Sequence, residues 1–183
     1  MSIVLVGSTS GSVTLQEPAV AGSTVLDLPA TSGTVALTSQ LPVAGPAFSA
    51  YRGSGGQQGV TSQTWTKVEL NTENFDTANC FDSTTNYRFT PNVAGYYQIN
   101  GSLYVTGSST VRFIVALYKN GAELTFGNYM GSYNSTQGVA VVSTLVYMNG
   151  STDYLELYGF NQAAGPTFVD NPALSMSGYL ART

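Results

Sequence analysis

From Pro46 to the C-terminus the sequence is a succession of short runs rich in β-branched and aromatic residues, separated by Gly, Asn, Pro and Ser. The runs include AFSAYR, TWTKVEL, GYYQINGSLYV, TVRFIVALYK, VAVVSTLVYM and LSMSGYLA, and none shows a sustained helical period. Asn120-Gly121 and Asn149-Gly150 lie between such runs and predict tight hairpins. The pattern predicts an all-β fold, an antiparallel sandwich of about eight or more strands.

Alternation assigns faces to these strands. One side of residues 96–105 is apolar, which predicts a half-buried strand whose inward side chains are Tyr97, Ile99, Leu103 and Val105. The runs at 111–119 and 139–148 are apolar on both sides, although a strand in a sandwich meets the core with one face only. We therefore expect a second subunit to cover the other face, with an interface that contains Ile114, Ala116, Tyr118, Val142 and Val146.

Four motifs occur in one order along the chain: PAFSAYR, RFTPNVAGYYQINGSLYV, VALYKNG and LSMSGYL. In this order they resemble the globular head of the complement C1q family, within the tumour-necrosis-factor-like jelly rolls, over residues 46–183. The resemblance implies an antiparallel jelly-roll sandwich that assembles as a tight homotrimer. It also implies that Tyr97 is a core aromatic residue, that Pro91 and Gly95 shape a turn, and that Gly178-Tyr179 belong to the closing strand. Some relatives bind calcium at the trimer axis, but no Asp/Glu cluster here supports such a site.

The first part of the chain, residues 1–44, is repetitive. Glycine recurs there at a constant interval, followed each time by leucine at the same place: Gly11, Gly22 and Gly33, then Leu15, Leu26 and Leu37. Units this short cannot bury an apolar face alone, so we expect them to stack or to need partner chains. The segment is similar to parts of phage fibre proteins, and a flexible Ser/Thr/Gly linker is the alternative. We expect a stem at 1–44 that attaches to a capsid or tail, and a head at 45–183.

The composition argues against most catalytic chemistry. The chain has no His, which removes Ser-His-Asp and Cys-His sites and imidazole metal ligands. An acid–base pair such as Asp153 and Glu156 is disfavoured, because the two positions point to opposite faces of a strand. Lys and Arg number 6 against 10 Asp and Glu, without a basic cluster, so nucleic-acid binding is not expected. We expect no enzyme, no cofactor and no metal.

The same composition favours a particle component. Charged residues make up 9% of the chain and Tyr number 12, typical of β-rich extracellular or particle-bound proteins and of subunit interfaces. The N-terminal MSIVLVG lacks a basic region and is too short for a signal peptide, and no run is long enough for membrane insertion. We expect a virion protein made in the host cytoplasm: a trimeric bacteriophage fibre or spike knob that binds a host glycan or protein. The alternatives are a capsid decoration or head-fibre protein with a purely structural role, and a secreted lectin-like module.

Counting antiparallel strands back from the last one places four loops at the end remote from the stem: 53–64, 106–110, 130–138 and 161–172. The two Asn-Gly turns then fall at the base. The remote loops combine Tyr and Phe with Ser, Gly, Asn and Gln, which is the composition of adaptable recognition loops. Solvated turns are the alternative for any single residue. The collective prediction is a distal contact surface that contains Tyr129, Tyr133, Asn134, Phe168 and Asp170.

Overall fold

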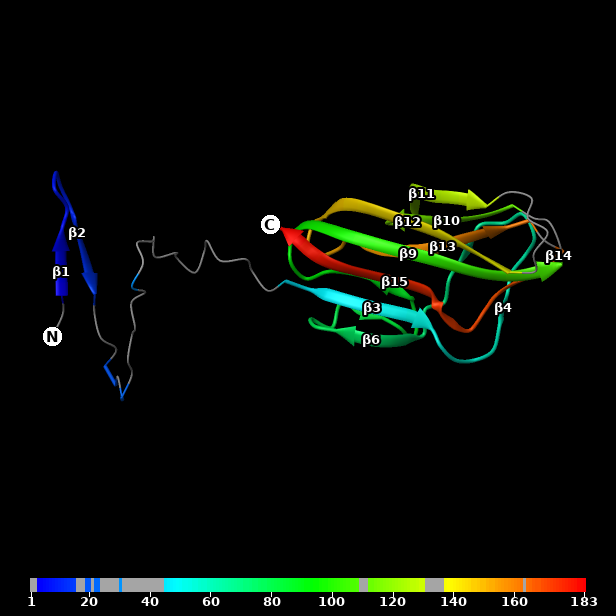
Figure 1. The fold of residues 1–183 in the computed structure, drawn as a ribbon, viewed down its shortest axis with the longest axis horizontal. Helices are drawn as coiled ribbons and strands as arrows, with labels where there is room; N and C mark the ends of the chain where they lie inside the picture. The colour runs from blue at the N-terminus through cyan, green and yellow to red at the C-terminus, as the bar shows by residue number, and fades with distance from the viewer. Residues whose placement is uncertain are drawn as a thin grey trace. The chain divides into compact units, whose positions relative to one another are not determined.

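The computed structural model describes residues 3–15, 19–20, 22–23, 30, 45–108, 112–130, 137–162 and 164–183. The described residues form strands and no helix (Figure 1). The chain separates into two compact units, Met1–Leu41 and Pro42–Thr183.

The first unit contains an antiparallel pair of strands, β1 (Ile3–Val6) and β2 (Ser12–Leu15). The turn between them is closed by a hydrogen bond from Gly7 N–H to Gly11 O, at 2.9 Å. Gly11 and Gly22 have φ values of 79° and 61°, in the left-handed region that glycine enters without strain. These two glycines occupy the same place in the repeat. Gly33, Leu26 and Leu37 lie outside the described residues.

The second unit is a sandwich of two antiparallel sheets with seven and six strands. Sheet I has the order β4 (Gln58–Gly59), β14 (Ala164–Phe168), β9 (Gly95–Ser108), β15 (Asn171–Arg182), β3 (Ala47–Arg52), β6 (Thr72–Asp76). Strand β12 (Gln137–Met148) is also paired to β9. Sheet II has the order β11 (Ala122–Met130), β10 (Phe113–Lys119), β13 (Leu155–Asn161), β8 (Arg88–Phe89), β7 (Phe81–Asp82), with β5 (Thr66–Lys67) also paired to β13. The last strand, β15, lies between β3 and β9, so it closes the sheet. The predicted all-β antiparallel class is confirmed.

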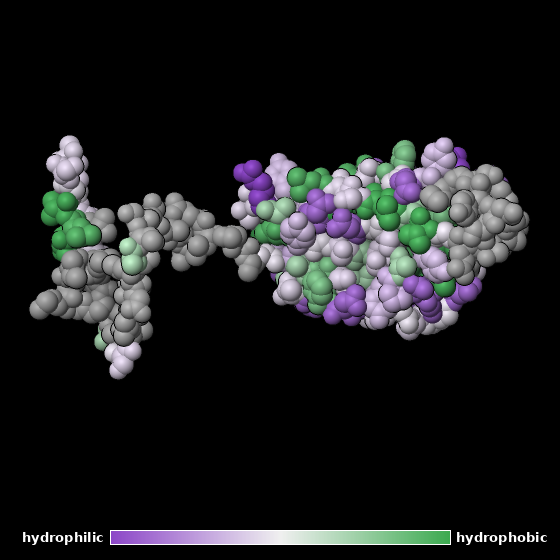
Figure 2. All heavy atoms as spheres, in the orientation of Figure 1, coloured by the Kyte–Doolittle hydropathy of each residue, from purple (hydrophilic) through white to green (hydrophobic). Residues whose placement is uncertain are grey.

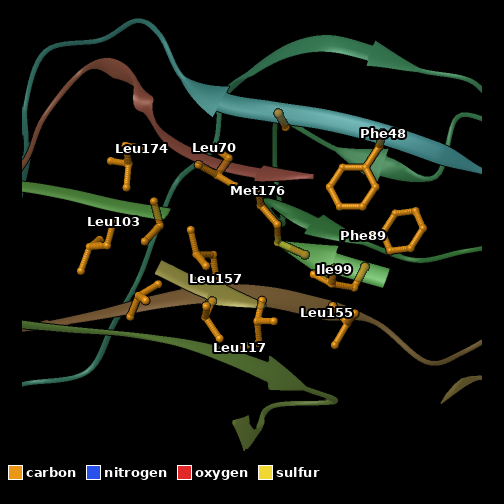
Figure 3. Close-up of a cluster of buried hydrophobic side chains, with 14 of the residues drawn as sticks. Phe48, Leu70, Phe89, Ile99, Leu103, Leu117, Leu155, Leu157, Leu174 and Met176 are labelled. Carbon is orange, nitrogen blue, oxygen red and sulfur yellow. The ribbon is translucent and has the colours of Figure 1, made fainter. Parts of the chain in front are cut away.

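The core fills the space between the two sheets (Figure 3). The predicted alternation along β9 is confirmed, because Tyr97, Ile99 and Leu103 are fully buried. The rings of Phe48 and Phe89 stack at 4.2 Å between centroids and join β3 to β8. Burying one such large apolar side chain stabilises the fold by about 1.5–3 kcal/mol. Burial of these side chains therefore holds the two sheets together.

One of the two predicted hairpins is confirmed and the other is wrong. Asn120 and Gly121 join β10 to β11 with φ values of 54° and 78°, which is the conformation of a tight primed turn. Asn149-Gly150 does not close a hairpin, since β12 belongs to sheet I and β13 to sheet II. Instead the Asn149 side-chain oxygen accepts the backbone N–H groups of residues 151, 152 and 153 and shapes a crossing between the sheets.

Close approaches confirm the two ends of the sandwich for the described residues. The predicted loops 106–110 and 130–138 lie partly outside those residues, and 106–108 and 164–168, predicted as loop, belong to strands β9 and β14. At the base, β9 begins beside the end of β15: a Cβ on Gly95 would lie 2.5 Å from Arg182 O. A Cβ on Gly150 would likewise meet Ala94 N at 2.3 Å. At the other end, Gln63 N–H donates to Asn161 O and Gln162 N–H donates to Arg112 O, both at 2.9 Å. The loops around 53–64 and 161–172 therefore meet at the distal end.

The buried Tyr97 predicts an alkaline limit to stability. Its hydroxyl donates to Val93 O at 2.8 Å, and burial raises the pKa of Tyr97 from 10.0 to about 12. The folded-state pKa is higher than that of the unfolded chain, so the unfolded chain loses this proton first. The stability that the neutral Tyr97 contributes is therefore fully present below pH 10 and is lost as the pH rises through about 12. In Tyr97→Phe the free energy of unfolding, measured by urea titration at fixed protein concentration, should fall less steeply over that interval. The exposed Tyr179→Phe is the control, and equal slopes in Tyr97→Phe and the unchanged protein would contradict the prediction.

Candidate binding surfaces

The face of sheet I that points away from the core, here called the open face, carries several exposed apolar side chains among polar ones, seen as green patches between white and purple ones in Figure 2. Along β12 the odd-numbered residues point outward, and Val141 and Leu145 are each 56% exposed. Large side chains of the open face come from three adjacent strands: Tyr96, Val139, Val141, Leu145, Tyr147 and Tyr179. Exposed large apolar side chains gathered on one sheet face are typical of surfaces that contact a protein, a membrane or a ligand.

The predicted interface residues of β12 lie on the opposite face. Val142 and Val146 are 4% and 7% exposed and belong to the core. In the register of the two strands Val146 lies opposite Tyr97, which points inward, so the even-numbered residues of β12 point inward as well. The prediction that this strand is apolar on both sides is right, and the choice of the outward side was wrong.

Small polar residues form the centre of the open face. They line a hollow of about 360 Å³ together with Val141 and Val142: Asn100, Gly101, Ser102, Ser143, Ser175 and Ser177. Ser143 Oγ donates to Asn100 Oδ1 at 2.8 Å and accepts from Gln98 Nε2 at 2.9 Å. Polar groups that are already hydrogen-bonded cost little to bury against another chain. The side chains of Gln98, Asn100 and Ser143 can therefore be covered by another chain at little cost.

A second exposed apolar patch lies on β11, at the edge of sheet II. Leu124 and Phe126 are 40% and 60% exposed there. Strand β11 is tied to β12 by the Asn128 side-chain oxygen, which accepts the Val141 N–H at 2.7 Å. The side patch, Leu124 and Phe126, belongs to sheet II, and its strand lies against the β12 edge of the open face.

The outer face of sheet II is covered by aromatic rings of the chain itself. We name Trp65, Tyr118, Tyr158 and Phe160 the aromatic cluster. The rings of Tyr118 and Tyr158 stack at 3.9 Å, and Trp65 lies 5.6 Å from Phe160 and 6.2 Å from Tyr118. Burial raises the pKa of both Tyr118 and Tyr158.

This cover corrects the prediction for β10. Ile114 and Ala116 were expected to meet a second subunit, but they are only 6% and 0% exposed within a single chain. Their cross-strand neighbours on β13 are Phe160 and Tyr158, whose rings belong to the aromatic cluster. Tyr118, the third predicted residue of this strand, is a partly buried member of the cluster.

Arg112 lies at the distal edge of the aromatic cluster. Its guanidinium is 6.0 Å from the Phe160 ring centroid and 5.4 Å from the Tyr129 ring centroid, within the range of cation–π contacts. Tyr129 itself is 61% exposed, so this member of the predicted distal surface is accessible.

The other predicted distal residues have different placements. Phe168 is fully buried, because β14 pairs with β9 and turns the ring toward Gly159, where a Cβ would lie 2.5 Å from Phe168 Cζ. Its assignment to a contact surface was wrong. The Asp170 side chain is 22% exposed, and its Oδ1 lies 2.9 Å from Arg52 Nε. Tyr133 and Asn134 lie outside the described residues.

Arg52 organises the distal loops from inside. Its side chain is 5% exposed, and besides Asp170 it meets Glu69 Oε2 at 3.4 Å. It also donates to Gly56 O at 2.7 Å and to Glu69 O at 3.1 Å, which ties the glycine-rich loop after β3 to the segment before β6. Asp170 lies at the distal end, and its carboxylate also pairs with the buried guanidinium of Arg52.

Sequence reasoning missed both the open face and the aromatic cluster. For the cluster a signal was available: Glu156, Tyr158 and Phe160 alternate with the buried Leu155 and Leu157. Among the residues that the structure describes, no helix is long and apolar enough to span a membrane. Within those same ranges, no group of three or more His, Cys, Asp or Glu side chains could hold a metal ion.

Neither a protein-family model nor a curated protein matches the sequence. Solved structures do match. The globular domain of zebrafish complement 1qA is 17% identical over 75% of this chain and 98% of its own, with a TM-score of 0.54. Eiger TNF from S. frugiperda is 11% identical over 75% and 94%, with a TM-score of 0.55.

A third similar structure is PRD1 vertex protein P5, which is 15% identical over 77% of this chain and 100% of its own, with a TM-score of 0.55. At these identities the likeness concerns the fold. The C1q/TNF-like jelly roll inferred from the motifs is confirmed.

Proposed function

We propose that this chain is a non-enzymatic structural protein of a virus particle, a homotrimeric knob that binds a host surface and is anchored through residues 1–44. The observation that carries the proposal is the open face of sheet I, with Val141 and Leu145 each 56% exposed in a single chain. Such side chains are stabilised when a second copy covers them.

The arrangement of the apolar surfaces favours a ring. The open face belongs to sheet I, whereas the side patch, Leu124 and Phe126, belongs to sheet II. Contact between two different surfaces of identical chains is head-to-tail, and such contacts form a ring when the rotation between copies closes and a filament when it does not. A ring of three is the assembly that the resemblance to the C1q family implies.

A role in a particle is supported by two observations. One protein of similar fold is named a vertex protein. The N-terminal hairpin exposes Val4, Leu5 and Val6 by 53%, 56% and 79%, which favours its burial against a partner.

Deletion of residues 1–44 tests the anchor. We expect the remaining chain to fold and to keep its oligomeric mass, because residues from Pro42 onward form a compact unit of their own. It should no longer be incorporated into particles, as measured by quantitative gel analysis of purified virions. Incorporation at the normal copy number would place the anchor in the head instead.

Particles that lack the whole protein test the binding role. We expect them to adsorb to host cells more slowly than particles that carry it. Unchanged adsorption would favour the alternative of a decoration protein whose role is purely structural.

A further inference from the structure

The aromatic cluster and Arg112 form a surface on sheet II, on the other sheet from the open face. The open face lies on β9, β12 and β15, whereas the cluster lies on β10, β13 and the segment before β5, beside β11, where Phe126 is opposite Ala116. Because Ile114 and Ala116 are already buried beneath rings of the same chain, this face needs no second copy to close it.

The rings present flat, half-buried faces to solvent. Trp65, Tyr118, Tyr158 and Phe160 are each of intermediate exposure, so one side of the cluster covers the sheet and the other remains accessible. Three ring pairs lie between 3.9 and 6.2 Å apart, which makes a continuous aromatic surface. Aromatic faces of this kind stack on the C–H faces of pyranose rings, and the polar edges of Tyr and Trp bond to hydroxyl groups.

The charge at the edge of the cluster is positive and available. Arg112 is exposed, and in the part of the chain that the structure describes no carboxylate forms an ion pair with it. Glu156, on the same face, is compensated by Lys67 at 3.2 Å. Contacts with Phe160 and Tyr129 orient the guanidinium. Among the described residues no acceptor is hydrogen-bonded to its N–H groups, which suit a planar anion such as a carboxylate.

Polar side chains surround Arg112 at the distal edge. Gln162 is exposed, and its N–H bonds to Arg112 O. Gln63 is also exposed, and its N–H bonds to Asn161 O beside it. Amide groups at such positions supply donors and acceptors for sugar hydroxyls. We propose that this surface binds a carboxylate-bearing saccharide, with the carboxylate at Arg112 and a sugar ring on the aromatic cluster. The inference rests on the proposed role in host binding and names the ligand class.

Trp65 is the single tryptophan of the chain, so its fluorescence reports on this surface. The full-length protein is titrated with an oligogalacturonate and, in parallel, with the same oligosaccharide methyl-esterified. We expect a saturable fluorescence change with the acid and binding weaker by about tenfold or more with the ester. Arg112→Gln should weaken binding of the acid by a similar factor. Arg88→Gln is the matched control, because Arg88 also stacks on a ring, that of Tyr154 at 4.4 Å, and should bind as the unchanged protein does.

Equal affinity for acid and ester, equal affinity in Arg112→Gln, or no saturable change at millimolar probe would overturn the inference. The ester comparison uses the unchanged chain, so the test stands even if a variant misfolds. A fluorescence change on dilution without probe would assign the surface to a second copy instead. If the probe fails to bind while particles that carry Arg112→Gln still adsorb normally, the proposed function stands and only this inference fails.

Discussion

Replacement of Leu145 by Asp is expected to convert the assembly into monomers. Light scattering should give three times the chain mass of 19.2 kDa for the unchanged protein and the mass of one chain for Leu145→Asp. Leu145 is 56% exposed in one chain and would be buried when a second copy covers the open face. An unpaired carboxylate buried there costs several kcal/mol, whereas in the separated chain it remains in water.

Two further variants make this test specific. Asn92→Asp adds the same charge at an exposed turn outside both apolar surfaces, and we expect it to leave the mass unchanged. Ile114→Asp places the charge at a site that is 6% exposed within the chain, so we expect loss of folded protein instead of folded monomers. A stable monomer from the unchanged protein at micromolar concentration would contradict self-association through the open face.

Phe168→Ala is expected to lower the free energy of unfolding by about 3–5 kcal/mol, because it deletes a fully buried ring and leaves a cavity. The cavity would open against Gly159 and Leu103, whose atoms cannot fill it without moving a strand. Chemical denaturation at fixed protein concentration measures the change, since assembly makes apparent stability depend on concentration.

Phe75→Ala is the matched control for this prediction. It removes the same side chain from β6 at a position that is 51% exposed, and we expect a loss below about 1 kcal/mol. If Phe168→Ala kept the stability of the unchanged protein and lowered only adsorption to the host, the ring would belong to a contact surface after all.

Variants of Leu145 and of Arg112 separate the roles of the two sheets. The open face of sheet I serves assembly in our proposal, and the outer face of sheet II serves the ligand. Variants of Leu145 should therefore change the mass without altering saccharide binding by the isolated chain. Variants of Arg112 should change binding and leave the mass unaltered.

The sequence by itself determined the fold class, the strand from Gly95 to Val105 and the two ends of the sandwich, although residues 106–108, predicted as a loop, continue that strand. Residues 96–105 alternate between apolar and polar, and the pleat of a strand converts that alternation directly into an inner and an outer face. Asn120-Gly121 determines its turn locally, because both residues adopt positive φ readily. The order of antiparallel strands then places the loops at opposite ends without further information.

Only the tertiary structure decided which side of β12 faces outward, what covers β10 and where Phe168 points. When both sides of a strand are apolar, alternation cannot choose between them, and the choice depends on the neighbour: Val146 points inward because it lies opposite Tyr97. Ile114 lies beside Phe160, which is far away in the sequence and whose ring contacts that of Trp65. Phe168 looks like a loop residue by composition, but its pairing with Val105 brings it into the core. Each of these contacts is made between distant segments, so the energy that selects it exists only once the sheets have packed.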